Sequence, residues 1–454
     1  MSDYKEYKLR DLVTFSQGIQ VPVEEQSNTR HSNMERFVRI VDFTNPNEEP
    51  RFIKIKDSKY WVNKKDVVMI RYGSATAGKV VRGLEGYIAN NMFKVIPNKS
   101  ILNEEFLYYF LSQSSIYSYL MNSQSSSTMP AIKFSDFDNI KIKLPSLDIQ
   151  KHIVLKLNIL NNKIELNTQI NQTLEQIAQA LFKSWFVDFE PVRAKAQALS
   201  DGLNLEQAEL AAMQAISGKT PEELTTLSQT QPDRYAELAE TAKAFPCEMV
   251  EVDGVEVPKG WEVKPLPEVI DFLEGPGIRN WQYTDEEDGI KFINIRCIQN
   301  GDLALTTANK ITKEEAFGKY KHFQLEEDDI VVSTSGTLGR FAFVRKEHLP
   351  LSLNTSVIRF RPIKNKSTLG FIAGFVENQL QHELETRASG SAQRNFGPTH
   401  LKQISLLVPD FKLLELHQKY ASSLFEKRKQ LLSEIDILKD TRDLLLPKLL
   451  NGYI

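Results

Sequence analysis

The feature that most constrains this chain is a long internal repeat. Segments of similar pattern occur in the same order in its two halves, and each match alone would be weak because strands resemble one another. The matched segments are KLRDLVTFSQG (8–18) with VKPLPEVIDFLEG (263–275), RFVRIVDF around Ile40 with KFINIRCI around Ile295, DVVMIRYG (66–73) with DIVVSTSG (329–336), and Asn91 with Asn354. Their shared order predicts a duplicated domain with a period of about 255–265 residues.

Each copy ends at a proline, where an alternating strand pattern changes to a long helical one. The prolines are Pro145 in IKIKLPSLDIQ and Pro409 in ISLLVPDFKLL. Steps of three and four residues then define one seam at residues 153, 157, 160, 164, 167, 171, 174, 178 and 181, and adding 264 to each gives the second seam. Two long helices in one heptad frame predict a matched antiparallel coiled coil. Its apolar contacts are expected from Leu157, Leu160, Ile164, Leu174, Leu424, Leu431, Ile435 and Leu438.

Two questions about this seam stay open in the sequence. An apolar stripe with three- and four-residue steps is also typical of a helix packed on its own domain. Polar residues interrupt the seam at Asn167, Asn171, Arg428 and Arg442. Such residues either pair across the seam and set its register, or mark places where the two helices separate.

Charge and cysteine content limit the class of protein. The net charge is −3, which by itself argues against a nucleic-acid partner, but the distribution is uneven. Residues 1–148 carry 20 basic and 17 acidic side chains, residues 191–257 carry 5 and 12, and residues 340–402 carry 10 and 4. Binding to phosphates requires a local positive surface rather than a positive total. Two cysteines, no apolar run long enough to cross a bilayer and a charged N-terminus favour a reducing, cytoplasmic setting.

Several longer motifs resemble the specificity subunits of type I restriction-modification systems. SWFVDFEPV, with Trp185, Phe189 and Pro191, and the later VPKGW, with Pro258, Gly260 and Trp261, are similar to the family's central conserved region. The tail RDLLLPKLLNGYI (442–454) resembles the distal conserved region, and ASGSAQRNFGPTHLKQISLLVP (388–409) resembles the end of a target-recognition domain. The resemblance covers essentially the whole chain in the family's order.

The resemblance implies an α/β (α+β) fold in which two similar target-recognition domains are separated by two long antiparallel helices, related by a pseudo-twofold internal repeat. The expected parts are domain 1 at 1–146, the first long helix at 147–190, an acidic helical segment and linker at 191–257, domain 2 at 258–409, and the second long helix at 410–454. It also implies a noncatalytic subunit that reads a bipartite double-stranded DNA site. Two modification subunits holding S-adenosylmethionine would methylate adenine, and motor-restriction subunits would complete the complex.

The residues themselves agree with the absence of an enzyme. NPNEEP at Asn45 lacks the aromatic residue and adjacent proline of an amino-methyltransferase loop, and no phosphate-binding G-x-x-x-x-G-K-[ST] loop is present. The histidines lack zinc-site spacing, so no metal site is expected. Asp328 and Asp329 precede a strand, where acidic turn residues are common. A protein-interaction scaffold that does not read DNA is the alternative, and it predicts salt-insensitive assembly without site preference.

DNA contacts are expected from two polar loops in each copy. Base edges are read by Arg, Lys, Asn, Gln, Ser or Thr, and phosphates are held by basic and small polar groups. The candidates are Arg71, Ser74, Thr76, Lys79 and Lys133 in the first copy, and Ser335, Thr337, Arg340, Ser391, Gln393, Arg394 and Asn395 in the second. Trp185 and Trp261 are expected to be structural, and Asn91 and Asn354 to bond backbone groups within the fold. For each loop residue taken singly, a solvated turn is the alternative interpretation.

Overall fold

The computed structural model describes residues 4–45, 48–123, 130–299, 301–336, 338–387 and 396–453. Its contacts divide the chain into two compact units, of which unit 1 contains residues 1–168 and 433–454 and unit 2 contains residues 169–432. Both units combine helices with mostly antiparallel sheets, so the predicted α/β (α+β) class is correct. No helix among the described residues is long and apolar enough to cross a membrane.

Unit 1 is built on two four-stranded sheets. The first has the order β2 (Val13–Gln17), β9 (Met92–Pro97), β6 (Val68–Ile70) and β7 (Val80–Val81), and all its neighbours are antiparallel. The second has the order β4 (Arg51–Lys54), β3 (Met34–Val38), β8 (Gly86–Ile88) and β5 (Trp61–Val62), with β3 parallel to β8. β1 (Lys5–Lys8) pairs with β10 (Lys141–Leu144), and α2 (Glu104–Leu111) and α3 (Ser114–Asn122) complete the domain.

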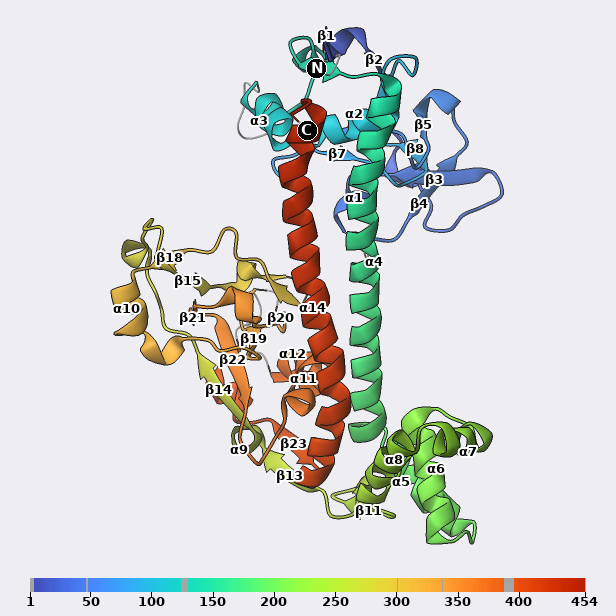
Figure 1. The fold of residues 1–454 in the computed structure, drawn as a ribbon, viewed down its shortest axis with the longest axis vertical. Coiled ribbons are helices and arrows are strands. Elements are labelled where there is room, and N and C mark those ends of the chain that lie inside the picture. Colours follow the sequence, from blue (N-terminus) through green and yellow to red (C-terminus); the bar gives the residue numbers. More distant parts are fainter. Residues whose placement is uncertain are drawn as a thin grey trace. The chain divides into compact units, whose positions relative to one another are not determined.

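Unit 2 repeats this plan. Its four-stranded sheet has the order β14 (Ile270–Glu274), β22 (Val357–Pro362), β19 (Ile330–Ser333) and β20 (Phe341–Phe343). A second sheet holds β18 (Lys310–Ile311), β15 (Ile290–Ile293) and β21 (Leu351–Leu353), with β15 parallel to β21. β13 (Glu262–Pro265) pairs with β23 (Ser405–Val408), and α11 (Leu369–Asn378) and α12 (Leu380–Arg387) follow β22. Figure 1 shows α11 and α12 beside the long helix α14 of this unit.

Equivalent hydrogen bonds confirm the duplication. Leu9 N donates to Ile140 O at 2.8 Å, and its partner in the repeat, Leu266 N, donates to Ile404 O at 2.9 Å. Asp66 accepts the backbone N–H three residues before it at 2.7 Å, and Asp329 does the same at 2.7 Å. A carboxylate that closes the turn before a buried strand is thus present in both copies.

One predicted match, Asn91 with Asn354, is wrong by two residues. β8 and β21 occupy equivalent parallel positions, and the residue after each strand is Ala89 in the first copy and Asn354 in the second. The second copy therefore has two additional residues between Gly336 and Asn354, in a stretch of turns where insertions are tolerated. Asn354 Oδ1 accepts from Ile278 N at 2.9 Å, as expected for a residue that satisfies the backbone, whereas Asn91 Oδ1 has no partner among the described residues.

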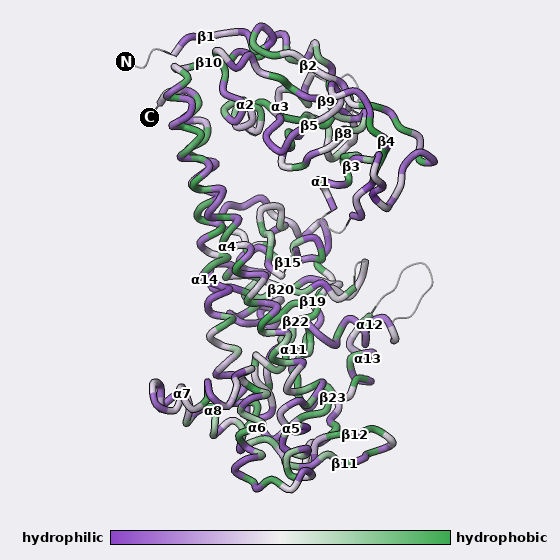
Figure 2. Tube along the Cα trace, turned by 90° about the vertical axis from the view of Figure 1, so that its right-hand side faces the viewer, coloured by the Kyte–Doolittle hydropathy of each residue, from purple (hydrophilic) through white to green (hydrophobic). Residues whose placement is uncertain are grey.

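The two long helices have matched ends. α4 (Leu147–Phe186) and α14 (Phe411–Leu450) each contain 40 residues and begin and end 264 residues apart. Figure 2 shows polar and apolar residues alternating along both helices, as an amphipathic pattern requires. Of the predicted seam residues, Leu157, Leu431 and Ile435 are buried, and Leu160, Ile164, Leu174, Leu424 and Leu438 are partly buried.

Within each unit the helices run antiparallel, and polar seam residues join them. In unit 1 Arg442 donates to Asn161 Oδ1 at 3.2 Å, and Lys163 lies 3.4 Å from Glu434. In unit 2 Arg428 lies 3.2 Å from Glu175. The seam arginines therefore pair across the helices. The amide atoms of Asn167, which is fully buried, have no partner among the described residues.

The helix ends belong to the domain cores. The core of unit 1 contains Leu446, Leu449 and Leu450 from the end of α14. The core of unit 2 contains the residues of α4 in the same frame, Phe182, Trp185 and Phe186. Each copy is therefore completed by the helix that follows the other copy, and the paired helices are not a free-standing coiled coil.

The acidic segment forms a small helical module within unit 2. Its helices are α5 (Glu190–Ser200), α6 (Leu205–Ser217), α7 (Pro221–Thr230) and α8 (Pro232–Ala244), followed by the hairpin β11 (Met249–Val252) and β12 (Val255–Pro258). Buried Lys195 donates to the carbonyls of Ala242 and Phe245 at 3.1 and 2.7 Å, which ties α5 to the end of α8. Glu240 of α8 lies 2.9 Å from Lys412, so the module packs against the start of α14.

Candidate nucleic-acid interface

The first candidate surface is one rim of the sheet in unit 1. Because β2, β9, β6 and β7 alternate in direction, the end of β2, the start of β9, the end of β6 and the start of β7 all meet at this rim. Arg71 directly follows β6, and Lys79 directly precedes β7. The loop between them is tightly turned: Ala77 N donates to Gly73 O at 2.9 Å, and Gly78 N donates to Ile70 O at 2.9 Å.

A backbone bond brings the two predicted loops of each copy together. In the first copy Ile132 N donates to Arg71 O at 3.0 Å, and in the second Phe396 N donates to Thr334 O at 3.0 Å. Residues 132 and 396 are again 264 apart. In both copies a described residue at the end of the second loop is thus anchored to the start of the first, and the described residues of the two loops around this bond are called the composite loop surface of each domain.

Most predicted contact residues of the first copy are accessible on this surface. Ser74, Lys79 and Lys133 are exposed, and Thr76 is partly buried, with its hydroxyl donating to Tyr72 O at 3.1 Å. Arg71 is partly buried, donates from Nη1 to Gln17 Oε1 at 3.0 Å and lies 5.0 Å from the Tyr72 ring centroid. The rim therefore combines exposed lysine charges with one guanidinium held in place by Gln17 and Tyr72.

The second copy presents a matching rim with other side chains. Ser335 is partly buried and Arg340 is exposed, with the Arg340 backbone N–H donating to Ser333 Oγ at 3.0 Å. Arg340 also lines an open groove of about 830 Å³ with Gln299 and Gln172. The predicted contacts Thr337, Ser391, Gln393, Arg394 and Asn395 lie outside the described residues.

Sequence reasoning overlooked two rim residues, Gln17 and Glu274. Each is the last residue of the first strand of its sheet, and each is partly buried. Gln17 reaches Arg71 two strands away, whereas no hydrogen bond or ion pair of the Glu274 side chain occurs among the described residues. Burial raises the pKa of the Glu274 carboxyl. The repeat alignment, which already matched Gly18 with Gly275, was the signal that could have identified this pair.

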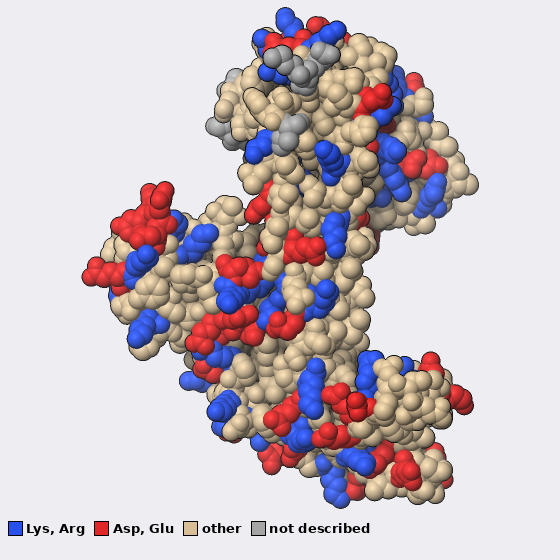
Figure 3. Space-filling model, in the orientation of Figure 1, with Lys and Arg blue, Asp and Glu red and all other residues tan. Residues whose placement is uncertain are grey.

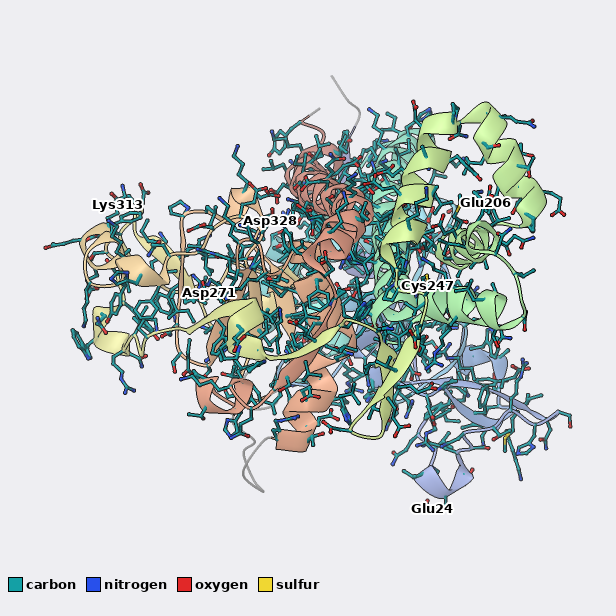
Figure 4. The ribbon with its side chains drawn as sticks, turned by 90° about the horizontal axis from the view of Figure 1, so that it is seen from below. Glu24, Glu206, Cys247, Asp271, Lys313 and Asp328 are labelled. Atoms are coloured by element: carbon teal, nitrogen blue, oxygen red, sulfur yellow. The ribbon has the colours of Figure 1, made fainter. Side chains whose placement is uncertain are left out.

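The acidic and aromatic residues considered for other roles are structural. Asp328 lies 2.8 Å from Lys429, and Asp329 binds Arg361 through both carboxylate oxygens at 2.7 and 2.8 Å. Figure 4 labels Asp328 and also Asp271, whose carboxylate pairs with Arg359 of the adjacent strand. Trp185 is fully buried and Trp261 is 9% exposed. The described residues contain no group of three or more potential metal ligands.

Charge on the molecular surface is mixed rather than concentrated. On the face drawn in Figure 3, Lys and Arg side chains are interspersed with Asp and Glu. A nonspecific polyanion-binding surface would show a broad field of one sign. The basic groups on the two rims are few. Such an arrangement suits DNA binding in which the placement of individual side chains matters more than the total positive charge.

Comparison with known proteins assigns the family. The family of the type I restriction modification DNA specificity domain matches residues 1–176 and 258–433. The type I restriction enzyme HindI specificity subunit of Haemophilus influenzae is 40% identical over the full length of both chains. The type I restriction enzyme MjaIX specificity subunit of Methanocaldococcus jannaschii is 24% identical, over 81% of this chain and 75% of that protein.

A solved structure agrees at the level of the fold. The crystal structure of the type I restriction-modification S subunit from M. genitalium matches 99% of this chain and 96% of that chain, with a TM-score of 0.50 and 14% identity. The two matched family domains coincide with the two copies of the internal repeat. The chain belongs to the family of type I restriction-modification specificity subunits. It is the DNA-specificity component of such a system and not an enzyme.

Proposed function

We propose that this subunit reads a bipartite DNA site, with one half read by each target-recognition domain. The observation that carries this proposal is the pair of equivalent rims with different side chains. Arg71 and Gln17 in the first copy correspond to Thr334 and Glu274 in the second, on the same strand ends. Equivalent strand ends that present different donors and acceptors suit two readers of different base sequences.

In this proposal the paired helices set the gap between the half-sites. A 40-residue helix is about 60 Å long at 1.5 Å per residue. One turn of B-DNA is about 34 Å, so such a helix exceeds one turn of the duplex. Inserting one heptad into both α4 and α14 is expected to lengthen the spacer of the recognised site, and an unchanged spacer would refute this role of the helices.

Two modification subunits and the motor-restriction subunits are the proposed protein partners. The modification subunits would hold S-adenosylmethionine and methylate adenine, in the same cytoplasm as the chromosome they protect. A row of exposed apolar residues on α4 supports such docking: Leu155, Ile159 and Leu166 are 59%, 59% and 50% exposed. Their spacing of four and seven continues at Ile170 and Ile177, which places all five on one helix face.

This apolar row belongs to α4 alone. Positions 264 residues later in α14 are Lys419, Ser423, Gln430, Glu434 and Thr441. We expect the double variant Leu155→Lys/Ile159→Lys to lose co-purification with the modification subunit while the free subunit keeps its thermal stability. Gln176→Lys, an exposed position of the same helix outside the row, is the matched control. Equal recovery of the complex with both proteins would exclude this face as the docking surface.

The function is tested by co-expressing the chain with its cognate modification subunit and mapping methylated adenines in host DNA. A split motif with a fixed gap, absent when this chain is omitted, is the expected result. Exchanging residues 1–146 for another recognition domain should then change one half of the motif only. Methylation without a motif, together with assembly that does not respond to salt, would favour the scaffold alternative.

A further inference from the structure

The most informative unassigned feature of the fold is the pair of strand-end positions 17 and 274. Each is followed by a glycine whose N–H bonds the central strand: Gly18 N donates to Met92 O at 3.0 Å, and Gly275 N donates to Val357 O at 3.1 Å. A Cβ on Gly18 would lie 2.2 Å from Ala89 O, and one on Gly275 would lie 2.1 Å from Asn354 O. The backbone is therefore held in the same close packing in both copies, and positions 17 and 274 are equivalent.

In the first copy the residue at this position, Gln17, holds the guanidinium of Arg71 in place. Gln17 Nε2 donates to the carbonyls of Asn90 and Met92, which leaves its Oε1 to accept from Arg71 Nη1. The guanidinium also lies over the Tyr72 ring, and its Nε is buried without a partner among the described residues, so the donors left for a base are the N–H groups of Nη2 and the second N–H of Nη1. A guanidinium held from two sides retains donors aimed in a fixed direction, and a bidentate pair of such donors matches the O6 and N7 of guanine.

In the second copy the same position is a single acceptor. Glu274 replaces Gln17, and Thr334, which is 4% exposed, replaces Arg71, so the strand-end positions of the second copy carry no counterpart of the Arg71 cation among the described residues. The Glu274 side chain is partly buried, but its carboxylate oxygens are not among the buried atoms and have no partner among the described residues, so they can accept a hydrogen bond from a group outside the chain. In a DNA groove, the group that donates to a carboxylate is the exocyclic amino group, most characteristically N4 of cytosine.

We propose that Gln17–Arg71 and Glu274 are equivalent base-reading elements, the first contacting a guanine in one half-site and the second an amino-bearing base, cytosine, in the other. This inference rests on the proposed bipartite function and adds to it the residues and base edges involved. This assignment also explains why the two copies share the same strand-end backbone but differ in their side chains. The first copy presents hydrogen-bond donors at this position, and the second presents acceptors. The charged loops nearby would then supply phosphate contacts that fix the register.

The test uses the subunit co-expressed with its modification partner and maps the methylation motif for Arg71→Lys and Glu274→Gln. Lysine keeps the positive charge of Arg71 but loses its bidentate geometry, so a phosphate contact would tolerate it and a guanine contact would not. We expect Arg71→Lys to lower discrimination at one position of the first half-site by about tenfold to a hundredfold. Glu274→Gln should broaden or change one position of the second half-site and leave the first half-site intact.

Controls separate the possible outcomes. Glu287→Gln makes the same charge change at an exposed turn of the second copy away from the rim and should leave the motif unchanged. Binding of the unaltered complex to a site in which each guanine of the first half-site is replaced in turn by 7-deazaguanine tests the same contact without any protein variant. One such replacement should weaken binding about tenfold or more.

A split wild-type motif that neither variant changes would overturn this inference and leave the bipartite function standing. Reduced methylation at every site with an unchanged motif would assign these residues to phosphate binding or stability, and would also overturn it. A wild-type motif that is not split would instead remove the proposed function on which the inference rests.

Discussion

The guanidinium of Arg428 in α14 lies 3.0 Å from the carboxylate of Glu377 in α11, and the two side chains are only 8% and 1% exposed. Arg428 also lies 3.2 Å from Glu175 of α4, so one buried cation joins three helices of unit 2. Burial raises the pKa of Glu377 to about 7, although the neighbouring Arg428 opposes this shift. A buried ion pair of this kind contributes little net stability, but losing one partner is costly.

We therefore predict that Arg428→Met destabilises unit 2 by about 3 kcal/mol, because Glu377 is left buried without its cation. The folded-state pKa of Glu377 lies above its ordinary value, so the folded state favours the protonated carboxyl. The stability that this protonation contributes is fully present below about pH 4.5 and is lost as the pH rises through 7. Arg428→Met should accordingly lose more stability at pH 8 than at pH 6 in denaturant titrations. Adding Glu377→Gln should recover most of the loss, and a double variant as unstable as the single one would contradict this account.

His417 gives unit 2 a second, opposite dependence on pH. It is fully buried among Phe182, Trp185 and Phe186, and burial lowers its pKa to about 3. The neutral imidazole favours the folded state above pH 6.5, and this contribution is lost at about 1.4 kcal/mol per pH unit as the pH falls from 6.5 towards 3. The equivalent residue of α4 is Ile153, which is buried in the core of unit 1.

His417→Ile should therefore flatten the loss of stability between pH 6.5 and 4.5. The measurement is the denaturation midpoint of unit 2 against pH, with His382→Gln as the matched control, because His382 is exposed on α12. If His417→Ile and the parent protein lose stability in parallel below pH 6.5, the acid sensitivity comes from other groups.

The parts of this fold that were predictable from sequence are those with local signals. The heptad frame and the prolines at 145 and 409 mark α4 and α14. Both signals, the helical periodicity and the proline that separates a strand from the following helix, can be read directly from the sequence. The order of matched strands similarly indicated the duplication. What the pattern could not show is that Phe182, Trp185 and Phe186 complete the core of the other copy, since this depends on which surface receives the helix end.

The candidate site was predictable only in part for the same reason. Polar loops such as 71–79 are recognisable by composition, whereas Gln17 and Glu274 look like ordinary polar positions in alternating strands. Only the sheet order β2-β9-β6-β7 places the end of β2 beside the end of β6, on either side of β9. Residues that become neighbours through non-consecutive strand pairing leave no local signal in the sequence.

Close packing of α11 against α4 supplies a third prediction. A Cβ added to Gly374 would lie 2.0 Å from the ring of Phe182, so this glycine allows the two helices to approach within unit 2. Although alanine favours helices, Gly374→Ala should destabilise unit 2 by about 1–3 kcal/mol through overpacking. Gly277→Ala, where a Cβ meets nothing within 4 Å, should be close to neutral in the same thermal-melting experiment. Equal melting temperatures for both variants would show that Phe182 moves aside at little cost.

The exposed basic residues of the rims provide the last prediction, which separates phosphate contacts from base contacts. Lys79, Lys133 and Arg340 have accessible side chains on the composite loop surfaces, and each is expected to neutralise one phosphate. Replacing any one with alanine should weaken DNA binding by the assembled complex to a similar extent on specific and nonspecific duplexes. It should also reduce the slope of log affinity against log salt by about 1, because fewer counterions are released. Fluorescence anisotropy at several salt concentrations measures both quantities, with Lys99→Ala as the control, since Lys99 is exposed but pairs with Glu104 away from the rim. An unchanged slope would remove that residue from the DNA interface, and a selective loss on one half-site would assign it to base reading instead.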